Sequence, residues 1–299
     1  MRIVSLVPHA TELLFALGLG DDVVGVTHEC DYPEAAQDLP QVTRDVLPPG
    51  LSPGEIDAAV RERTAGGESI YELDEELVAE LEPDLIVTQA LCHVCAVSVD
   101  EVQALAQTLP GPPRVIALAP TTYGETVGDV RTIAQATEAK DAALDLIART
   151  ARRADVVRLA VRGAPRPRVA ALEWMDPVFV AGHWTPQLIE MAGGDDVLGF
   201  AGEPSREATW DEVAAAQPEI VVVMPCGYDA ARALVEAESF ADRLRTVGAA
   251  QVVAVNASAY FSRPGPRLID GLELLAHILH PDRVPQAPAE ALAVELGPA

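Results

Sequence analysis

The chain has 299 residues, of which 49% are hydrophobic, and its formal net charge is −25. Its length and apolar content predict a globular protein of about two domains. The negative charge excludes nucleic acid and an anionic membrane surface as partners, because no basic stripe is expected to neutralise phosphates. No stretch approaches the roughly 20 apolar residues of a membrane span, so no membrane insertion is expected.

Strands and helices alternate along the first half of the chain. The expected strands are 2–7, 23–27, 84–88 and 114–118, and the expected helices are 10–17, 53–63, 74–81, 98–108 and 124–137. Residues 44–70 are rich in proline, glycine and charge and form an insertion. Strands that alternate with helices predict a mainly parallel sheet covered on both faces.

One long helix is expected over residues 138–163. An apolar residue recurs there every three or four positions, as in Ala143, Ile147, Val157 and Val161, and Gly163 ends the pattern. At about 1.5 Å per residue the helix would be roughly 37 Å long, enough to connect two lobes.

The second half repeats the alternation of the first. Its expected strands are 167–173, 196–200, 219–224 and 251–255, and its expected helices begin at Thr185 and span 210–216, 229–236 and 265–280. Residues 282–299, rich in proline and alanine, predict a loosely held tail.

Three segments of the first half recur in order in the second. Gly20-Asp21-Asp22-Val23 matches Gly194-Asp195-Asp196-Val197, 73–89 matches 209–225, and 114–123 matches 251–260. This pseudo-repeat predicts an α/β fold with two similar Rossmann-like lobes, mainly parallel sheets and a ligand cleft between them. The predicted parts are an N-terminal lobe (1–137), a connecting helix (138–163), a C-terminal lobe (164–283) and a tail (284–299).

Aromatic and histidine residues cluster after the predicted strands, where parallel sheets bind their ligands. The candidate ligand-binding residues are Pro8, His9, His28, Glu29, His93, Tyr123, Trp174, His183, Trp184, Tyr228, Tyr260 and Phe261. The aromatic side chains suit a flat macrocycle, and a histidine could cap its metal. Packing of the aromatic residues and hydrogen bonding of the histidines are the structural alternatives.

All four cysteines also follow predicted strands. Cys92 and Cys95 form a CxxC motif, and Cys30 and Cys226 occupy corresponding loops. Thiolates brought together could hold zinc or an iron–sulfur cluster. Structural or accidental cysteines remain the alternative.

The chain resembles the periplasmic-binding-protein family for cobalamin, haem and ferric siderophores, over about residues 1–280. The resemblance rests on Ser5-Leu6-Val7-Pro8, Asp31-Tyr32-Pro33, Glu82-Pro83-Asp84-Leu85 and Tyr260-Phe261-Ser262-Arg263-Pro264. It implies two lobes joined by a single helix, with the cobalamin-binding branch nearest. It also implies docking on an ABC permease through Glu101 and Glu212, although Thr209-Trp210-Asp211-Glu212 equally reads as a helix capping box.

These features predict non-catalytic binding of a large metal chelate, with cobalamin or another corrinoid favoured and no cofactor required. No phosphate loop, nucleophile elbow or paired-carboxylate motif indicates an enzyme. The alternative is a cytosolic metal- or iron–sulfur-binding protein, redox-active through its cysteines. No signal peptide precedes the first strand, so the predicted location is the cytoplasm; a periplasmic or cell-surface location is the alternative if a leader was removed.

Overall fold

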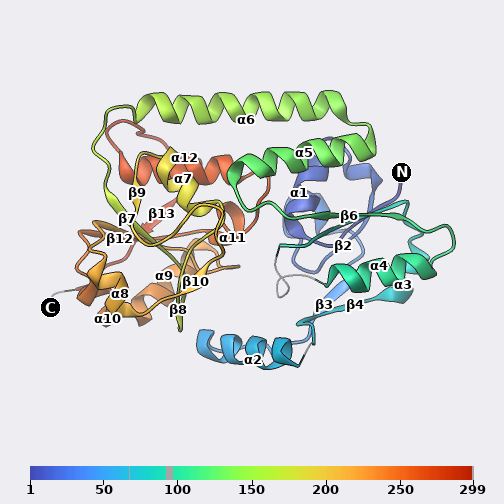
Figure 1. Ribbon diagram of the computed structural model, residues 1–299, viewed down its shortest axis with the longest axis horizontal. Coiled ribbons are helices and arrows are strands. Elements are labelled where there is room, and N and C mark those ends of the chain that lie inside the picture. Colours follow the sequence, from blue (N-terminus) through green and yellow to red (C-terminus); the bar gives the residue numbers. More distant parts are fainter. Residues whose placement is uncertain (67, 92–96, 298–299) are drawn as a thin grey trace. The chain divides into compact units, whose positions relative to one another are not determined.

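The computed structural model describes residues 1–66, 68–91 and 97–297 (Figure 1). The chain forms two compact units. Unit 1 consists of residues 1–120 and 126–147, and unit 2 consists of residues 121–125 and 148–299. The short segment 121–125 therefore packs with unit 2, although it follows the last strand of unit 1.

Unit 1 is built on a four-stranded parallel sheet in the order β2-β1-β5-β6. These strands are β1 (Ile3–Ser5), β2 (Val23–Val26), β5 (Leu85–Gln89) and β6 (Arg114–Leu118). The surrounding helices are α1 (Pro8–Ala16), α3 (Glu75–Glu80), α4 (Val99–Thr108) and α5 (Tyr123–Thr137), with short 3-10 helices η1 (Gly20–Asp22) and η2 (Glu34–Ala36).

Both faces of this sheet are covered, as the apolar strands require. Successive side chains of a strand point to opposite faces. Ile3 therefore joins a buried cluster that includes Leu14 of α1 and Ile133 of α5, whereas Val4 joins a second cluster that includes Val102 of α4. The core of unit 1 is thus divided into two layers by the sheet.

The predicted insertion contains a separate two-stranded ribbon and a helix. β3 (Thr43–Asp45) pairs antiparallel with β4 (Tyr71–Leu73), and α2 (Pro53–Ala65) lies between them in sequence. α2 begins with a capping box in which Ser52 and Glu55 satisfy each other's backbone N–H groups.

Helix α6 (Lys140–Ala160) begins in unit 1 and ends in unit 2. It is the long helix expected over 138–163, and Gly163, at φ +71°, follows it in the left-handed conformation that favours glycine. Ala143 and Val157 are buried, but Ala151 is exposed, so the apolar stripe is covered only towards the two ends. No helix in the described part of the chain is long and apolar enough to cross a membrane.

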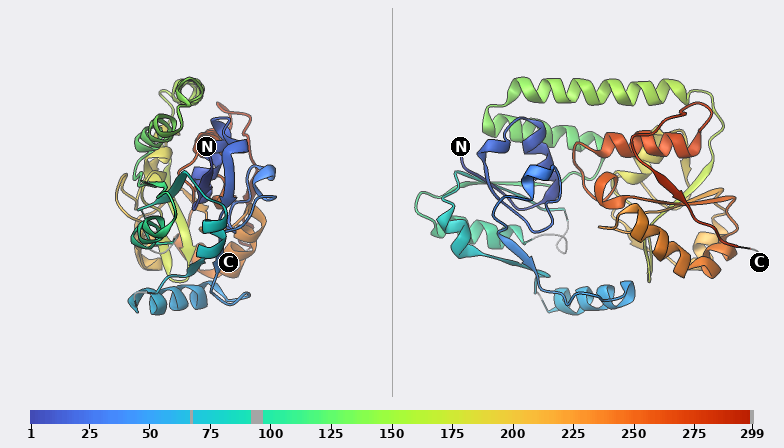
Figure 2. Two further views of the ribbon diagram at one scale, coloured as in Figure 1. Left: turned by 90° about the vertical axis from the view of Figure 1, so that its right-hand side faces the viewer. Right: turned by 180° about the vertical axis from the view of Figure 1, so that it is seen from behind.

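Unit 2 is built on a seven-stranded sheet with the main order β10-β8-β7-β11-β12-β13, in which β9 also pairs with β7. The right-hand view of Figure 2 shows its strands and helices from behind. The strands are β7 (Arg168–Met175), β8 (Val178–Val180), β9 (Asp195–Asp196), β10 (Arg206–Glu207), β11 (Ile220–Val223), β12 (Gln251–Val255) and β13 (Ala291–Ala293). β9, β7, β11 and β12 are parallel, whereas β8, β10 and β13 pair antiparallel.

Helices cover both faces of this second sheet. They are α7 (Thr185–Met191), α8 (Trp210–Ala215), α9 (Ala230–Ser239), α10 (Ala241–Val247), α11 (Ala257–Tyr260) and α12 (Leu268–Leu279). Figure 1 shows α7 and α12 on one face and α8, α9 and α10 on the other. The predicted fold class of two similar α/β lobes with mainly parallel sheets and one long linking helix is confirmed.

Three predictions for the second half were wrong in detail. The strand expected over 196–200 ends at Asp196, because β8 occupies the rest of that edge of β7. The helix expected over 265–280 begins only at Leu268, as α12, since Pro266 disfavours a helical conformation at the residue before it. The tail is not loosely held throughout, because β13 pairs with β12.

Candidate ligand-binding site

In unit 1, His28 and Glu29 follow the carboxyl end of β2 and are both held by the β3–β4 ribbon. Thr43 Oγ1 lies 3.2 Å from the backbone N of His28 and 2.8 Å from its Nδ1. The ring of Tyr71 lies 5.2 Å from that of His28, and its hydroxyl donates to Glu29 Oε1 at 3.0 Å. The sequence pattern did not indicate Thr43 or Tyr71, because the ribbon strands are only three residues long and meet across the insertion.

Cys30 belongs to a buried polar network inside unit 1. Its Sγ lies 3.1 Å from Thr11 Oγ1 and 3.5 Å from Thr27 Oγ1, and Thr11 also donates to Ser5 Oγ at 2.8 Å. His9 is buried nearby in the first turn of α1, which Pro8 begins. These residues tie α1 to the ends of β1 and β2.

In unit 2, His183 has a backbone conformation that side chains rarely adopt, with φ +52°. Two hydrogen bonds fix it: its N–H donates to Glu203 O at 2.6 Å, and the N–H of Gly202 donates to His183 O at 2.9 Å. Burial lowers the pKa of the imidazole, so its neutral form is favoured. A neutral imidazole has one nitrogen able to accept a hydrogen bond or bind a metal. Strained residues of this kind cluster at functional sites.

Trp184 and Phe261 are enclosed within unit 2, with 5% and 3% of their surfaces exposed. The indole Nε1–H donates to Phe261 O at 2.7 Å. The Trp184 side chain therefore fixes the backbone after α11 against the start of α7. Their predicted ligand contacts stay a prediction, and their position in this structure is that of supporting residues.

Trp174 and Tyr228 form a second aromatic group near the ends of β7 and β11. Their rings pack edge to face with centroids 5.7 Å apart, and the guanidinium of Arg232 lies 3.7 Å above the Tyr228 ring. Burial raises the pKa of the Tyr228 phenol, with Arg232 acting in the opposite direction. Tyr228 is buried, whereas Trp174 and Tyr260 are partly exposed and remain accessible from solvent.

Tyr123 opens α5 but is anchored in unit 2. Its backbone N–H donates to Gln187 Oε1 of α7 at 2.9 Å. Burial raises the pKa of its phenol to about 12, with Arg153 acting in the opposite direction. Arg153 pairs with Asp270 and Glu273 of α12 at 2.5 Å and 2.7 Å, so α6 and α12 are clamped together beside it.

Little supports the predicted thiolate metal site. Cys92, His93 and Cys95 lie outside the described residues, Cys30 is buried in unit 1, and Cys226 is exposed on unit 2. Within residues 1–66, 68–91 and 97–297, no three His, Cys, Asp or Glu side chains are arranged to hold a metal ion. Zinc and iron–sulfur chemistry therefore find no support in the described structure.

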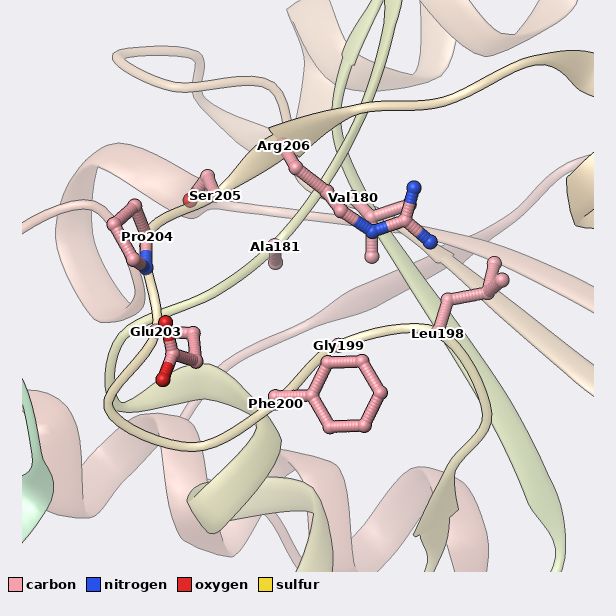
Figure 3. A pocket seen from close by; sticks show the side chains of 9 residues that line it. All are labelled: Val180, Ala181, Leu198, Gly199, Phe200, Glu203, Pro204, Ser205 and Arg206. Carbon is pink, nitrogen blue, oxygen red and sulfur yellow. The ribbon is translucent and has the colours of Figure 1, made fainter.

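A pocket of about 470 Å³ lies on unit 2 next to the loop that fixes His183 (Figure 3). It is lined by Val180, Ala181, Leu198, Gly199, Phe200, Glu203, Pro204, Ser205 and Arg206. Asp196 shapes this loop, since its Oδ1 accepts the N–H groups of Leu198 and Gly199 at 2.9 and 2.7 Å. Burial raises the pKa of Asp196, and these two hydrogen bonds act against that rise. The pocket was not predicted, because it depends on contacts between β8 and a loop distant in sequence.

The two predicted docking glutamates have different surroundings. Glu101 lies in the first turn of α4, where burial and the nearby Glu75 raise its pKa. Glu212 closes the capping box of α8 with Thr209, and these hydrogen bonds lower its pKa. Arg206 lies 3.5 Å from Glu212, so this carboxylate already has two partners within unit 2.

Comparison with known proteins gives a consistent family. A family model described as periplasmic binding protein matches residues 3–258. The vitamin B12-binding protein of Vibrio cholerae is 23% identical over 292 residues, which cover 91% of this chain and 86% of the relative. That of Pectobacterium atrosepticum is 25% identical over 282 residues, which cover 90% of this chain and 84% of the relative.

Solved structures share the fold. The periplasmic vitamin B12-binding protein BtuF of Vibrio cholerae matches with a TM-score of 0.67 and 22% identity, over 93% of this chain and 96% of that one. The periplasmic haem-binding protein RhuT from Roseiflexus sp. RS-1 matches with a TM-score of 0.66 and 23% identity, over 95% and 98%. Similar folds thus occur in proteins named for two different metal macrocycles.

The predicted cytoplasmic location is wrong. The matching family is described as periplasmic, and so are the similar vitamin B12- and haem-binding structures. The prediction relied on the position of the first strand at the start of the sequence, but an exported protein loses its leader on maturation, so where a sequence starts is no evidence of location.

Proposed function

Because the chain belongs to the periplasmic binding protein family, we propose that it binds a large metal chelate without changing it chemically, with cobalamin as the favoured ligand. The observation that carries this proposal is the match of about nine-tenths of the chain to relatives named as vitamin B12-binding proteins. Haem is the second ligand to test, because similar folds bind it by name.

The residues proposed to contact the ligand are those left accessible at the carboxyl ends of the strands. On unit 2 these are Trp174, Tyr260 and His183; on unit 1 they are His28 and Glu29. Flat aromatic rings suit the apolar faces of a macrocycle. His28, whose ring is held by a hydrogen bond to Thr43, is suited to bind an open axial position of the chelated metal, since that bond fixes the ring.

The buried members of the predicted set have a supporting role in this proposal. Trp184, Tyr228 and Phe261 are enclosed within unit 2 and hold the loops that carry the accessible residues. The partner proposed for the loaded protein is an ABC permease. Glu101 is the better docking candidate of the two glutamates, because Glu212 is engaged by Thr209 and Arg206.

The test is a titration of the purified protein with cyanocobalamin, hemin and a ferric hydroxamate siderophore, followed by thermal unfolding. A ligand that binds only the folded state raises the melting temperature by mass action. Trp174→Ala should reduce the shift given by the true ligand. Trp210→Ala is the matched control, because Trp210 stacks on Phe240 at the end of α9 remote from the loop of Tyr228.

Each shift is compared with the melting temperature of the same variant without ligand, so loss of stability by itself does not count. No shift with any of the three chelates at large excess would eliminate the proposed function. If hemin alone raised the melting temperature, the protein would still be a chelate-binding protein, but its ligand would be haem and not cobalamin. An equal reduction in Trp174→Ala and Trp210→Ala would remove Trp174 from the site.

A further inference from the structure

The negative charge of the chain conceals one basic segment. Residues 149–168 contain seven of the 21 Lys and Arg residues and a single acidic residue, Asp155. This segment covers the second half of α6 and the turn that leads into β7. The expectation that no local basic surface exists, drawn from the net charge of −25, was therefore wrong for this part of unit 2.

A groove of about 910 Å³ lies beside this segment, within unit 2. One wall is the end of α6 and the following turn, with Arg158, Arg162 and Arg166, and the other is α7, with Glu190 and Met191. We call this the arginine groove. Because Arg166 precedes β7, the groove lies at the amino end of the sheet, opposite to the carboxyl ends where the chelate is proposed to bind. It is therefore a separate site.

The arginines of the groove are available to a partner. The pair of Arg158 with Asp155 leaves 74% of the arginine side chain exposed, and the pair of Arg166 with Asp195 leaves 44% exposed. Such exposed pairs contribute little to stability, so a new carboxylate can compete for them. Arg162 is exposed and has no ion-pair partner in the part of the chain that the structure describes. Its carbonyl accepts from Arg283 at 3.1 Å, which fixes the turn that carries it.

Apolar side chains accompany these charges. Val156 and Leu159 of α6 are 67% and 61% exposed, and Leu159 lines the groove together with Val161 and Met191. Arginine and methionine are both enriched at protein–protein interfaces, and Met191 lines this groove together with the arginines. A concave groove suits an inserted chain segment better than a flat bilayer, and the rest of this acidic protein would repel the same segment.

We propose that the arginine groove binds an acidic segment of a partner protein, with carboxylates pairing to Arg158 and Arg162 and an apolar side chain packing on Leu159 and Met191. The bidentate geometry of the guanidinium group matches a carboxylate. The site requires no chelate and no second unit, so it is independent of the proposed ligand-binding function.

The test uses a fluorescent peptide of Glu-Glu-Leu repeats, with a Lys-Lys-Leu peptide as the charge control, and measures anisotropy against protein concentration. Arg162→Gln should weaken binding of the acidic peptide by about two- to fivefold, as expected for one exposed ion pair. Leu159→Ser should weaken it by about fivefold through loss of partial apolar burial. Arg243→Gln, which removes an exposed arginine of α10, is the matched control and should leave binding unchanged.

Several outcomes would overturn the proposal. These are no binding of the acidic peptide at low salt, equal binding of the lysine peptide, or equal loss in Arg162→Gln and Arg243→Gln. Binding to phosphatidylglycerol vesicles without peptide binding would assign the groove to a membrane surface instead. Self-association of the wild-type chain that Arg162→Gln abolishes would assign it to a second copy.

Discussion

The two units share one arrangement of hydrogen bonds at the amino ends of their sheets. In unit 1, the backbone N–H of Arg2 donates to Asp84 Oδ2 at 2.7 Å, which joins β1 to the start of β5. In unit 2, the backbone N–H of Arg168 donates to Glu219 Oε2 at 2.8 Å, which joins β7 to the start of β11. The repeat detected from residue patterns therefore extends to individual hydrogen bonds.

The guanidinium groups of the same two arginines add a second hydrogen bond that both units share. Arg2 Nε donates to Leu81 O at the end of α3, at 2.7 Å, and Arg168 Nε donates to Gln217 O at the end of α8, at 3.1 Å. Each arginine thus satisfies a carbonyl at or just beyond the end of a helix, where the helix itself offers no donor. Helix, strand and neighbouring strand are fixed together at the same point in both units.

The units differ at the other side of the first strand. In unit 1, β2 runs beside β1 as a four-residue parallel strand. In unit 2, the corresponding β9 has only two residues, and β8 pairs antiparallel with the remainder of β7. His183 follows the β7–β8 hairpin and is hydrogen-bonded to the loop after β9. The same loop lines the pocket of Figure 3. The amino ends of the sheets, which the units share, maintain the fold. The edge at which unit 2 diverges carries the candidate binding residue His183.

The largest expected effect on stability comes from Trp184, which follows His183 in unit 2. Trp184→Ala should lower the free energy of unfolding by about 3–5 kcal/mol, because a buried indole leaves a cavity. It also leaves the carbonyl of Phe261 without its donor. Trp174→Ala should cost clearly less, since Trp174 is partly exposed. Urea denaturation of both variants measures this difference, and equal losses would contradict the assignment of Trp184 as a supporting residue.

How far the sequence predicted these features depends on the range of the interactions. Strands 114–118 and 251–255 were predicted at their observed bounds, because their apolar residues report burial locally. The strand at 196–200 failed because a distant segment, β8, competes for the same edge of β7. Polar contacts across the insertion, such as Thr43 with His28, leave no periodic signal. The sequence identified the aromatic residues as candidates by their type, but it could not predict which of them are buried and which are accessible.

The repeated glycines Gly25 and Gly199 offer a sharper comparison. A Cβ at Gly199 would lie 2.5 Å from the backbone oxygen of Ala181, which cannot move without shifting β8. A Cβ at Gly25 would meet Leu81 Cδ1 at 2.7 Å, the end of a flexible side chain. Gly199→Ala should therefore destabilise by about 3 kcal/mol and Gly25→Ala by about 1 kcal/mol, within the range for overpacking. Denaturation curves test the order, and a larger loss in Gly25→Ala would refute the comparison.

His183 makes the stability of unit 2 depend on pH. Its pKa in the folded protein is lowered from the ordinary 6.5 by burial, so the unfolded chain takes up the proton first. The stability contributed by neutral His183 is present above about pH 6.5 and is lost as the pH falls through the folded pKa. His183→Asn removes this titration with a residue that tolerates positive φ. The variant should gain stability relative to wild type between pH 7 and pH 5, and parallel pH profiles would contradict this.

The smallest expected effect tests the shared ends. Glu82 and Gln217 each follow a helix, at φ +43° and +48°, and each precedes a proline. Both side chains are exposed, so the left-handed backbone is the main cost at each position. Glycine is preferred at this place after a helix because it has no Cβ to strain. Glu82→Gly and Gln217→Gly should each stabilise the protein by roughly 0.5 kcal/mol, after the entropy that glycine adds to the unfolded chain is subtracted. Chemical denaturation of both variants and the double variant measures this. If one variant gained stability and the other lost it, the two helix ends would differ in energy although their backbones are alike. The repeat would then extend to the geometry of the helix ends but not to their energetics.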